Sequence, residues 1–358
     1  MFSLLPCALH QGEKGEREME TERSYDYPAK NAVREAWMRF LPLFAMRDLE
    51  HPIRGLYLPS TQNLELSGYL AKGMDPNGLI GVEHDPRWQD RIEMHGHKIA
   101  LVRGTIQDAV QMVRDKKWYP LTFANFDFEG SYHTFIRDVL SVFSVLPAQD
   151  ASYITVSSYC ARDDDALLQG IINTSKFYST FDSSTQFWSA YGRMKDRYSA
   201  LRRQLSGGGS LEEHTHLSRE LGFLWWIALA LGTIENRNGT VWSVTESYME
   251  TFDDILQDIS RRVSVHTDEP GEFRVLNDPR LSDRLKARTC SLWPDRFEHY
   301  VWFTAQHQPM RTWMIRIQPI EADSPKPTHF EIIEQLWNMA TRTPLVYFTN
   351  NGTKITFE

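Results

Sequence analysis

Residues 54–85, RGLYLPSTQNLELSGYLAKGMDPNGLIGVEHD, decide the fold of this chain. Two short apolar runs, 55–58 and 78–82, are bounded by glycine and proline, and this pattern predicts two strands. The apolar residues between them recur at helical spacing: Leu64, Leu66, Tyr69 and Leu70. Strand, helix and strand in this order form a βαβ unit, which places the two strands in parallel.

The second strand of this unit ends on a carboxylate, Glu83, followed by His84. A carboxylate at that point can accept hydrogen bonds from a ribose diol. The turn after the first strand, PSTQN at 59–63, contains no glycine. Glycine lets a backbone approach a pyrophosphate closely, so its absence argues against NAD. It favours a ligand without a pyrophosphate, or no ligand.

The alternation of strands and helices continues to residue 181. Apolar runs predict strands at 98–103, 121–128 and 152–157. Helical patterns are expected at 31–45, 85–96, 106–113, 132–146 and 163–181. Five alternations of strand and helix predict an α/β fold with a mostly parallel sheet covered on both faces.

The pattern changes in the second half of the chain. Residues 182–262 show no convincing strand and are expected to form a helical insertion. Two runs, 300–304 and 313–317, have no helix between them and therefore predict an antiparallel pair. A helix at 330–341 and a hairpin with strands 345–348 and 354–357 follow. The expected divisions are a tail at 1–26, a core at 27–181, the insertion, the end of the core sheet at 263–320 and an appendage at 321–358.

Composition narrows the functional classes. The chain has 358 residues and a net charge of −8, which gives no general attraction to nucleic acid or to an anionic membrane. Its three cysteines form no Cys-x-x-Cys pair, so we expect neither a zinc site nor a disulfide framework, and a cytoplasmic location. No apolar run reaches the ~18 residues of a membrane span, and the charged tail does not resemble a signal peptide. His95 and His97 have no third ligand by spacing, so we expect no metal.

Five βα units followed by an antiparallel pair resemble the class I S-adenosylmethionine-dependent methyltransferases. The resemblance runs from about residue 54 to 317 without the insertion, and four strings carry it: LYLPSTQNLEL, GLIGVEHD, NFDFEG and HYVWFTAQHQPM. The chain looks most similar to divergent methyltransferase-like proteins of bacterial and phage genomes. The resemblance implies a Rossmann-like methyltransferase fold and S-adenosylmethionine as the cofactor.

The resemblance also assigns roles to individual residues. The loop after the first strand wraps the methionine part of the cofactor in this family, the acid after the second strand binds the ribose, and the loop after the third strand contacts adenine. In this chain the implied cofactor-binding residues are Pro59, Ser60, Thr61, Asn63, Glu83, His84 and Thr105.

Asp127 and Glu129 lie where the family faces its methyl acceptor. One of them could act as a general base or orient the acceptor atom. Amino-methylating members carry two prolines there, and this chain has none, which puts adenine-N6 and cytosine-N4 methylation in doubt. No Pro-Cys pair follows the fourth strand, so a cytosine-C5 thiolate has no candidate.

Two functions therefore follow from the sequence. The first is a methyltransferase acting on nucleic acid, whose phosphates would be bound by the basic residues of helix 187–205: Arg193, Lys195, Arg197, Arg202 and Arg203. The second is a non-catalytic scaffold with the same fold, which works through the insertion and the appendage. In either case, residues 182–262 could form an oligomer or partner surface.

Overall fold

The computed structural model describes most of the sheet and the helices that cover it. The described residues are 25–44, 53–115, 121–128, 130, 135, 138–139, 141–146, 150–159, 184–205, 227, 234–237, 241–244, 290, 292–321 and 323–358. The statements below concern these residues.

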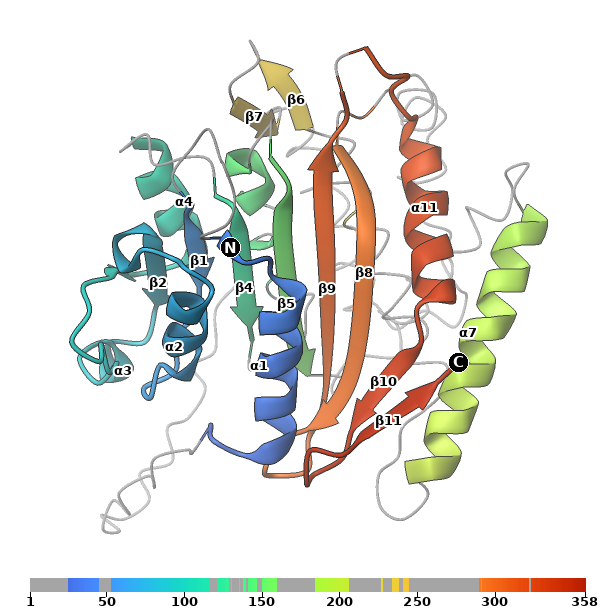
Figure 1. Cartoon of the computed structure of the whole chain (residues 1–358), viewed down its shortest axis with the longest axis horizontal. Coiled ribbons are helices and arrows are strands. Elements are labelled where there is room, and N and C mark those ends of the chain that lie inside the picture. The colour runs from blue at the N-terminus through green and yellow to red at the C-terminus, as the bar shows by residue number, and fades with distance from the viewer. Residues whose placement is uncertain are drawn as a thin grey trace, which may run out of the picture.

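A nine-stranded sheet forms the centre of the molecule, in the order β11-β10-β8-β9-β5-β4-β1-β2-β3 (Figure 1). The strands of its first half are β1 Gly55–Tyr57, β2 Leu79–Glu83, β3 Ala100–Arg103, β4 Phe123–Asp127 and β5 Ser152–Tyr159. The strands of its second half are β8 Leu292–Phe303, β9 Pro309–Pro319, β10 Leu345–Phe348 and β11 Lys354–Phe357. Each strand overlaps a run that the sequence predicts as a strand.

The first five strands are parallel, and β9 runs antiparallel to both β5 and β8. The predicted α/β, Rossmann-like layout with a terminal antiparallel pair is therefore confirmed. The strand order reverses at β1, which has β2 on one side and β4 on the other. Open α/β sheets bind ligands at the carboxyl ends of their strands beside such a reversal.

Helices cover both faces of the sheet, because successive side chains along a buried strand point to opposite sides. Leu56 and Tyr57 of β1 belong to two different hydrophobic clusters. Tyr57 shares its cluster with α1 and α2, whereas Leu56 shares the other cluster with α4, α7 and α11. These helices are α1 Pro28–Phe40, α2 Leu64–Ala71, α4 Ile106–Asp115, α7 Ser184–Leu205 and α11 His329–Arg342.

The helix expected at 85–96 is wrong in its length. Its start is as predicted, since Asp85 caps α3, Pro86–Gln89, by accepting a hydrogen bond from the Arg87 backbone amide. The helix ends there because the following residues bind the first loop instead. The Glu93 amide donates to the Thr61 carbonyl at 2.7 Å, and His95 contacts the carbonyl of Gln62.

A short hairpin lies in the segment that was expected to contain no strand. Strands β6 Ile234–Arg237 and β7 Val241–Val244 pair antiparallel in a separate two-stranded sheet. The expectation was wrong because the Asn-Gly pair at 238–239 was interpreted only as a turn, although Asn-Gly between two strand-like runs is a strong hairpin signal.

The C-terminal hairpin continues the central sheet. Strands β10 and β11 pair antiparallel as predicted, and β10 also pairs in parallel with β8. In the turn between them Gly352 has φ +81°, a conformation that favours glycine. The last two strands thus extend the sheet on the side opposite β3. The domain divisions expected from the sequence stay a prediction.

Several predictions fall outside the described residues. These are the tail, the helix at 163–181, the helices expected after residue 206 in the insertion, and Glu129. The helix expected at 132–146 is described only in part. Within the described part of the chain, no helix is long and apolar enough to cross a membrane.

Candidate functional site

The carboxyl ends of β1, β2 and β3 bring the predicted cofactor-binding residues to one edge of the sheet. The loop 59–63 follows β1, Glu83 ends β2, and Thr105 follows β3. The Gly104 amide donates a hydrogen bond to the Glu83 carbonyl at 3.1 Å, so the loops after β2 and β3 are in contact. The residues predicted to bind the cofactor therefore lie at the same edge of the sheet.

The first loop is held by packing at both ends. Pro59 is buried against β2, where a side-chain carbon added to Gly81 would lie 3.2 Å from the proline ring. Asn63 is fully buried in the left-handed conformation, with φ 46°. Its side chain accepts a hydrogen bond from the Tyr57 hydroxyl and donates one to the Glu93 carbonyl, each at 3.0 Å. Asn63 therefore shapes the loop, and its side chain is already engaged.

The middle of the first loop contains two buried polar atoms that, unlike those of Asn63, have no hydrogen-bond partner among the described residues. The hydroxyl oxygen of Ser60 and the side-chain carbonyl oxygen of Gln62 are both buried, and neither has a hydrogen-bond partner among the described residues. Buried polar atoms are nearly always paired in folded proteins, so two unpaired ones in one loop are unusual. These atoms are suited to a polar ligand, which would supply the missing partners.

Glu83 is partly engaged and partly open. Its Oε1 accepts a hydrogen bond from the Asp85 amide at 2.7 Å and lies 3.5 Å from Nδ1 of His84. Its Oε2 has no partner among the described residues, and the side chain is 17% exposed. His84 itself is 82% exposed. The Asp85 contact orients the carboxylate while one oxygen remains able to accept a hydrogen bond from a ligand.

Thr105 has a structural task at the start of α4. Its backbone amide and hydroxyl both donate to Oδ2 of Asp108, at 2.7 and 2.8 Å, and its hydroxyl accepts from the Asp108 amide. This reciprocal arrangement caps the helix. The two hydrogen bonds to Thr105 hold the pKa of Asp108 below its ordinary value. Thr105 lies at the expected edge, and its exposed position leaves room for a ligand beside it.

Asp127, the predicted acceptor-facing acid, is paired with a lysine of α1. Its Oδ2 forms an ion pair with Nζ of Lys30, which also lies 4.9 Å from the Trp302 ring centre. The Lys30 side chain is 7% exposed and that of Asp127 is 24% exposed. The acid is therefore at the carboxyl end of β4 as predicted, but α1 covers it. Glu129 is not among the described residues.

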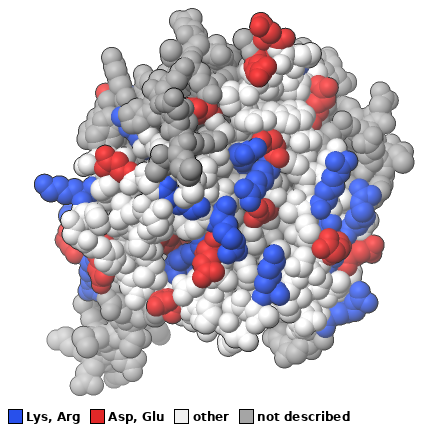
Figure 2. Space-filling view, in the orientation of Figure 1, with Lys and Arg blue, Asp and Glu red and all other residues white. Residues whose placement is uncertain are grey.

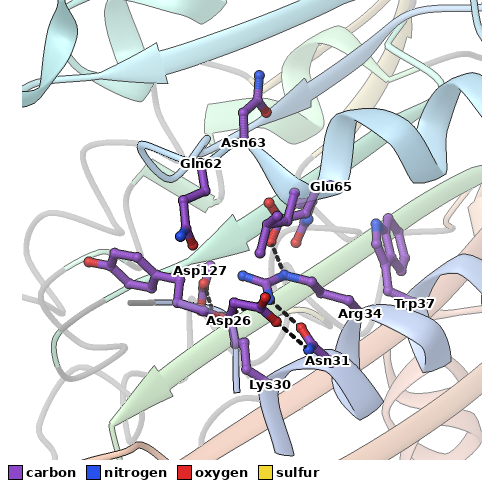
Figure 3. Close-up of polar contacts among 12 residues, drawn as sticks. Asp26, Lys30, Asn31, Arg34, Trp37, Gln62, Asn63, Glu65 and Asp127 are labelled. Atoms are coloured by element: carbon purple, nitrogen blue, oxygen red, sulfur yellow. Dashed lines mark hydrogen bonds and ion pairs between the residues drawn. The ribbon is translucent and has the colours of Figure 1, made fainter. Parts of the chain in front are cut away.

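A second ion pair beside this one was not predicted. Arg34 lies one helical turn after Lys30, and its Nε donates to Oε1 of Glu65 at 2.7 Å. The exposed fractions of the two side chains are 11% and 7%. Figure 3 shows Gln62, Glu65 and Asp127 around the space that Lys30 and Arg34 reach from α1. Two cations spaced four residues apart could have indicated this face of α1, because such residues lie on the same side of a helix.

Two buried tyrosines, Tyr57 and Tyr69, lie near the Glu65 carboxylate. Burial, together with the nearby Glu65 carboxylate, raises the pKa of Tyr57 and of Tyr69 well above the ordinary value. Both phenols thus stay protonated, and the hydroxyl of Tyr57 donates to the Asn63 side chain. The Tyr69 hydroxyl also accepts hydrogen bonds from Asn125 at 2.7 Å and from Trp37 at 3.2 Å. This network fixes α2 on the sheet.

The predicted basic surface of α7 loses one member. Arg197 is only 7% exposed, and its terminal nitrogens donate to the carbonyls of Ala340, Thr341 and Thr343 at the end of α11. It is a helix cap and does not belong to an exposed surface. Arg193, Arg202 and Arg203 are exposed, while nothing is described of the Lys195 side chain. Figure 2 shows basic side chains over α7, interspersed with acidic ones on the rest of this face.

The described residues contain no group of three or more His, Cys, Asp or Glu side chains that could hold a metal ion. The described part of the candidate site is an arrangement of hydrogen-bonding and charged side chains. That arrangement has two parts, the loop ends at β1–β3 and the charged pairs under α1.

No family model matches the chain, and no curated protein matches it. Among solved structures, it is similar to the plantazolicin methyltransferase BamL in complex with a triazolic desmethylPZN analog and SAH, at 13% identity and a TM-score of 0.29, covering 79% of this chain and 85% of that one. It is also similar to the cyclopropane synthase MmaA2 from Mycobacterium tuberculosis, at 9% identity and a TM-score of 0.28, covering 84% and 87%. At these identities and TM-scores the likeness is weak, and the fold is defined by the order and direction of the strands.

Proposed function

We propose that this chain is an S-adenosylmethionine-dependent methyltransferase-like protein whose cofactor binds at the carboxyl ends of β1, β2 and β3. The observation that carries the proposal is Glu83. It ends β2 beside the reversal of strand order, and one of its oxygens is oriented while the other lacks a partner among the described residues. A carboxylate in that place suits the two hydroxyls of a ribose.

The first loop supports the same ligand. The unpaired buried oxygens of Ser60 and Gln62 lie next to the strand end where the family resemblance places the methionine part of the cofactor. The loop contains no glycine, so its side chains would face the ligand and its backbone would stay farther away. This suits a ligand without a pyrophosphate. When bound, the cofactor supplies an electrophilic methyl group. The task left to the protein is to align an acceptor atom with it.

Among the described residues, we propose Asp127 as the side chain that contacts the methyl acceptor. Its pairing with Lys30 keeps a negative charge at the carboxyl end of β4, under α1. A carboxylate held there can orient a hydroxyl or an amine, or accept a proton from it. We propose this role for Asp127.

A nucleic-acid acceptor remains a prediction, with less support than the cofactor site. The exposed arginines of α7 lie beside β11 and α11, at the other end of the sheet from Glu83. Five strand spacings of ~4.8 Å separate β11 from β4, so a substrate in contact with both would have to span about 24 Å. Any role of residues 182–262 as an oligomer or partner surface is likewise a proposal.

A non-catalytic scaffold is the second candidate, and a specific observation favours it. Asn63 is engaged within the protein, and Asp127 is covered by α1 through Lys30. A non-catalytic scaffold that binds partners through its surface would keep such contacts and would need no ligand at this edge of the sheet.

Calorimetric titration with S-adenosylmethionine and S-adenosylhomocysteine tests the proposal. We expect saturable binding by the wild type and weaker binding by Glu83→Ala. Asp115→Ala, which removes an exposed acid at the end of α4, should bind as the wild type does. Absence of binding by the wild-type protein would reject the enzyme and leave the scaffold.

A further inference from the structure

The Arg34–Glu65 ion pair is incomplete in a particular way. An arginine and a carboxylate commonly form two parallel hydrogen bonds, one to each carboxylate oxygen. Here Nε of Arg34 binds Oε1 of Glu65, whereas Nη2 of Arg34 and Oε2 of Glu65 are buried and have no partner among the described residues. The pair thus retains one unused cationic donor and one unused anionic acceptor.

The rest of the arginine is held firmly. Its Nη1 donates to the Tyr25 carbonyl at 2.8 Å and to the Asn31 side chain at 2.7 Å. With Nε and Nη1 both engaged, the guanidinium plane is fixed, and Nη2 keeps its direction. Leaving a buried hydrogen-bonding atom without a partner is costly, so this arrangement favours a ligand that supplies partners for Nη2 and Oε2.

Two further buried atoms without a partner among the described residues belong to the loop that precedes Glu65. Ser60 and Gln62 contribute two further acceptor oxygens from the loop before α2. In Figure 3 the side chains of Gln62 and Glu65 both extend toward α1, which carries Arg34. One cationic donor, one anionic acceptor and two neutral oxygens match a ligand that carries both a carboxylate and an ammonium group.

A groove between α1 and α2 gives such a ligand a place for its apolar part. The groove has a volume of about 360 Å³, and its wall includes both Arg34 and Glu65. Met38, Leu64 and Gly68 contribute apolar surface to the same wall. A side-chain carbon at Gly68 would lie 2.7 Å from the Met38 sulfur, so the glycine lets the two helices approach at this point.

We infer that Arg34 and Glu65 form a subsite for the α-amino-acid group of the methyl acceptor, with an apolar side chain in the groove between α1 and α2. Arg34 Nη2 would bind the carboxylate and Glu65 Oε2 the ammonium group. The subsite lies under the same helix that brings Lys30 to Asp127, which is the acid proposed to receive the acceptor. Its assignment to an acceptor rests on the proposed function, whereas its ligand chemistry does not.

Three small molecules of matched shape test this inference on the full chain. L-leucine carries both charges, 4-methylpentanoate lacks the amino group, and 3-methylbutylamine lacks the carboxylate. Ligand-observed NMR titrations should show that the wild type binds L-leucine at least tenfold more tightly than either analogue. No saturable binding of L-leucine, or equal binding of all three, would overturn the inference without any variant.

Two variants then assign the charges. Arg34→Met should remove the preference for L-leucine over 3-methylbutylamine, and Glu65→Gln should remove the preference over 4-methylpentanoate. Arg342→Gln, an exposed arginine of α11, is the matched control and should keep both preferences. Equal weakening of all three probes in both variants would mean that the pair only supports the structure, and would contradict the subsite.

Titration with S-adenosylhomocysteine separates this inference from the proposed function. Leucine selectivity without S-adenosylhomocysteine binding would support the amino-acid subsite and reject the cofactor site. S-adenosylhomocysteine binding without leucine selectivity would reject the subsite alone. If the ammonium and carboxylate preferences disappear once S-adenosylhomocysteine is bound, the subsite holds the amino-acid end of the cofactor, and the assignment to an acceptor is overturned.

Discussion

Two buried arginines of this molecule, Arg197 and Arg34, differ in how their terminal nitrogens are used. At the β8–β11 end, Arg197 directs both of them at carbonyls that α11 leaves unpaired at its C-terminus. At the carboxyl ends of β1 and β4, Arg34 leaves Nη2 without a partner beside an equally unpaired oxygen of Glu65. Arg197 thus uses both terminal nitrogens to hold the end of α11, although its Nε has no partner among the described residues, whereas Arg34 keeps one terminal nitrogen that the fold does not use.

The largest effect is expected at Arg197. Arg197→Met removes the donors to three carbonyls at the end of α11, and we expect the free energy of unfolding to fall by about 3–5 kcal/mol. Urea denaturation measures this change. Arg202→Met, on the exposed side of the same helix, should stay within about 0.5 kcal/mol of the wild type. Equal stability of the two variants would show that Arg197 is not a structural cap.

We also expect the stability of the protein to depend on pH through His299 of β8, which lies near Arg197. His299 is buried, and its pKa is lowered by that burial from 6.5 to about 3, despite its hydrogen bond to the Thr343 carbonyl. Between these values the unfolded chain binds a proton that the native protein excludes. Stability should therefore rise with pH through this window, by up to about 1.4 kcal/mol per pH unit, and be fully present above pH 6.5.

His299→Gln should reduce this slope between pH 4 and 6, measured by urea denaturation at fixed ionic strength. The Arg311 guanidinium faces His299 Nδ1 at 3.3 Å, and Arg197 lies close enough to disfavour a second positive charge. An unchanged slope would assign the acid sensitivity to carboxylates elsewhere.

At the other end of the sheet, Glu83→Ala should affect binding more than folding. Loss of a hydrogen bond to a charged group corresponds to about 1–3 kcal/mol of binding free energy for S-adenosylhomocysteine. Calorimetry measures the affinity, and thermal unfolding without ligand measures the stability. A variant that loses stability while keeping its affinity would place Glu83 among the structural residues.

The smallest effect on stability is expected where the unpaired atoms lie. Replacing Arg34 and Glu65 together by methionine removes both buried charges at once and keeps their volume. The free energy of unfolding should then change by no more than about 1 kcal/mol, since apolar replacements of a whole buried ion pair are often neutral. A loss close to that of Arg197→Met in the same denaturation experiment would mean that Arg34 and Arg197 contribute equally to the stability of the fold.

The sequence predicts the sheet well, because its strands are short apolar runs with clear boundaries. The hairpin at β10 and β11 was located from its Asn-Gly turn, and Gly352 has the positive φ that this turn requires. The helix at 85–96 could not be predicted correctly, since contacts with Thr61 and Gln62 compete with helical hydrogen bonds after Gln89. Local patterns carry no information about such a partner about thirty residues away.

The candidate site divides in the same manner. Glu83 and Asp127 were identified because a strand end in a βαβ unit is a defined position in the sequence. Arg34 and Glu65 were not identified, because their pairing depends on how α1 packs against α2, and a charged residue on a helix usually faces solvent. Arg197 was assigned to a basic surface for the same reason, although it is buried.

Hydrogen exchange with and without S-adenosylhomocysteine tests whether the cofactor binds at the carboxyl ends of β1, β2 and β3, and it reports on both ends of the sheet in one experiment. We expect slower exchange of backbone amides at 59–63, 83–85 and 104–105 when the ligand is present, and no change at 345–357. Protection confined to α7 and β11, or no protection in any segment, would contradict it.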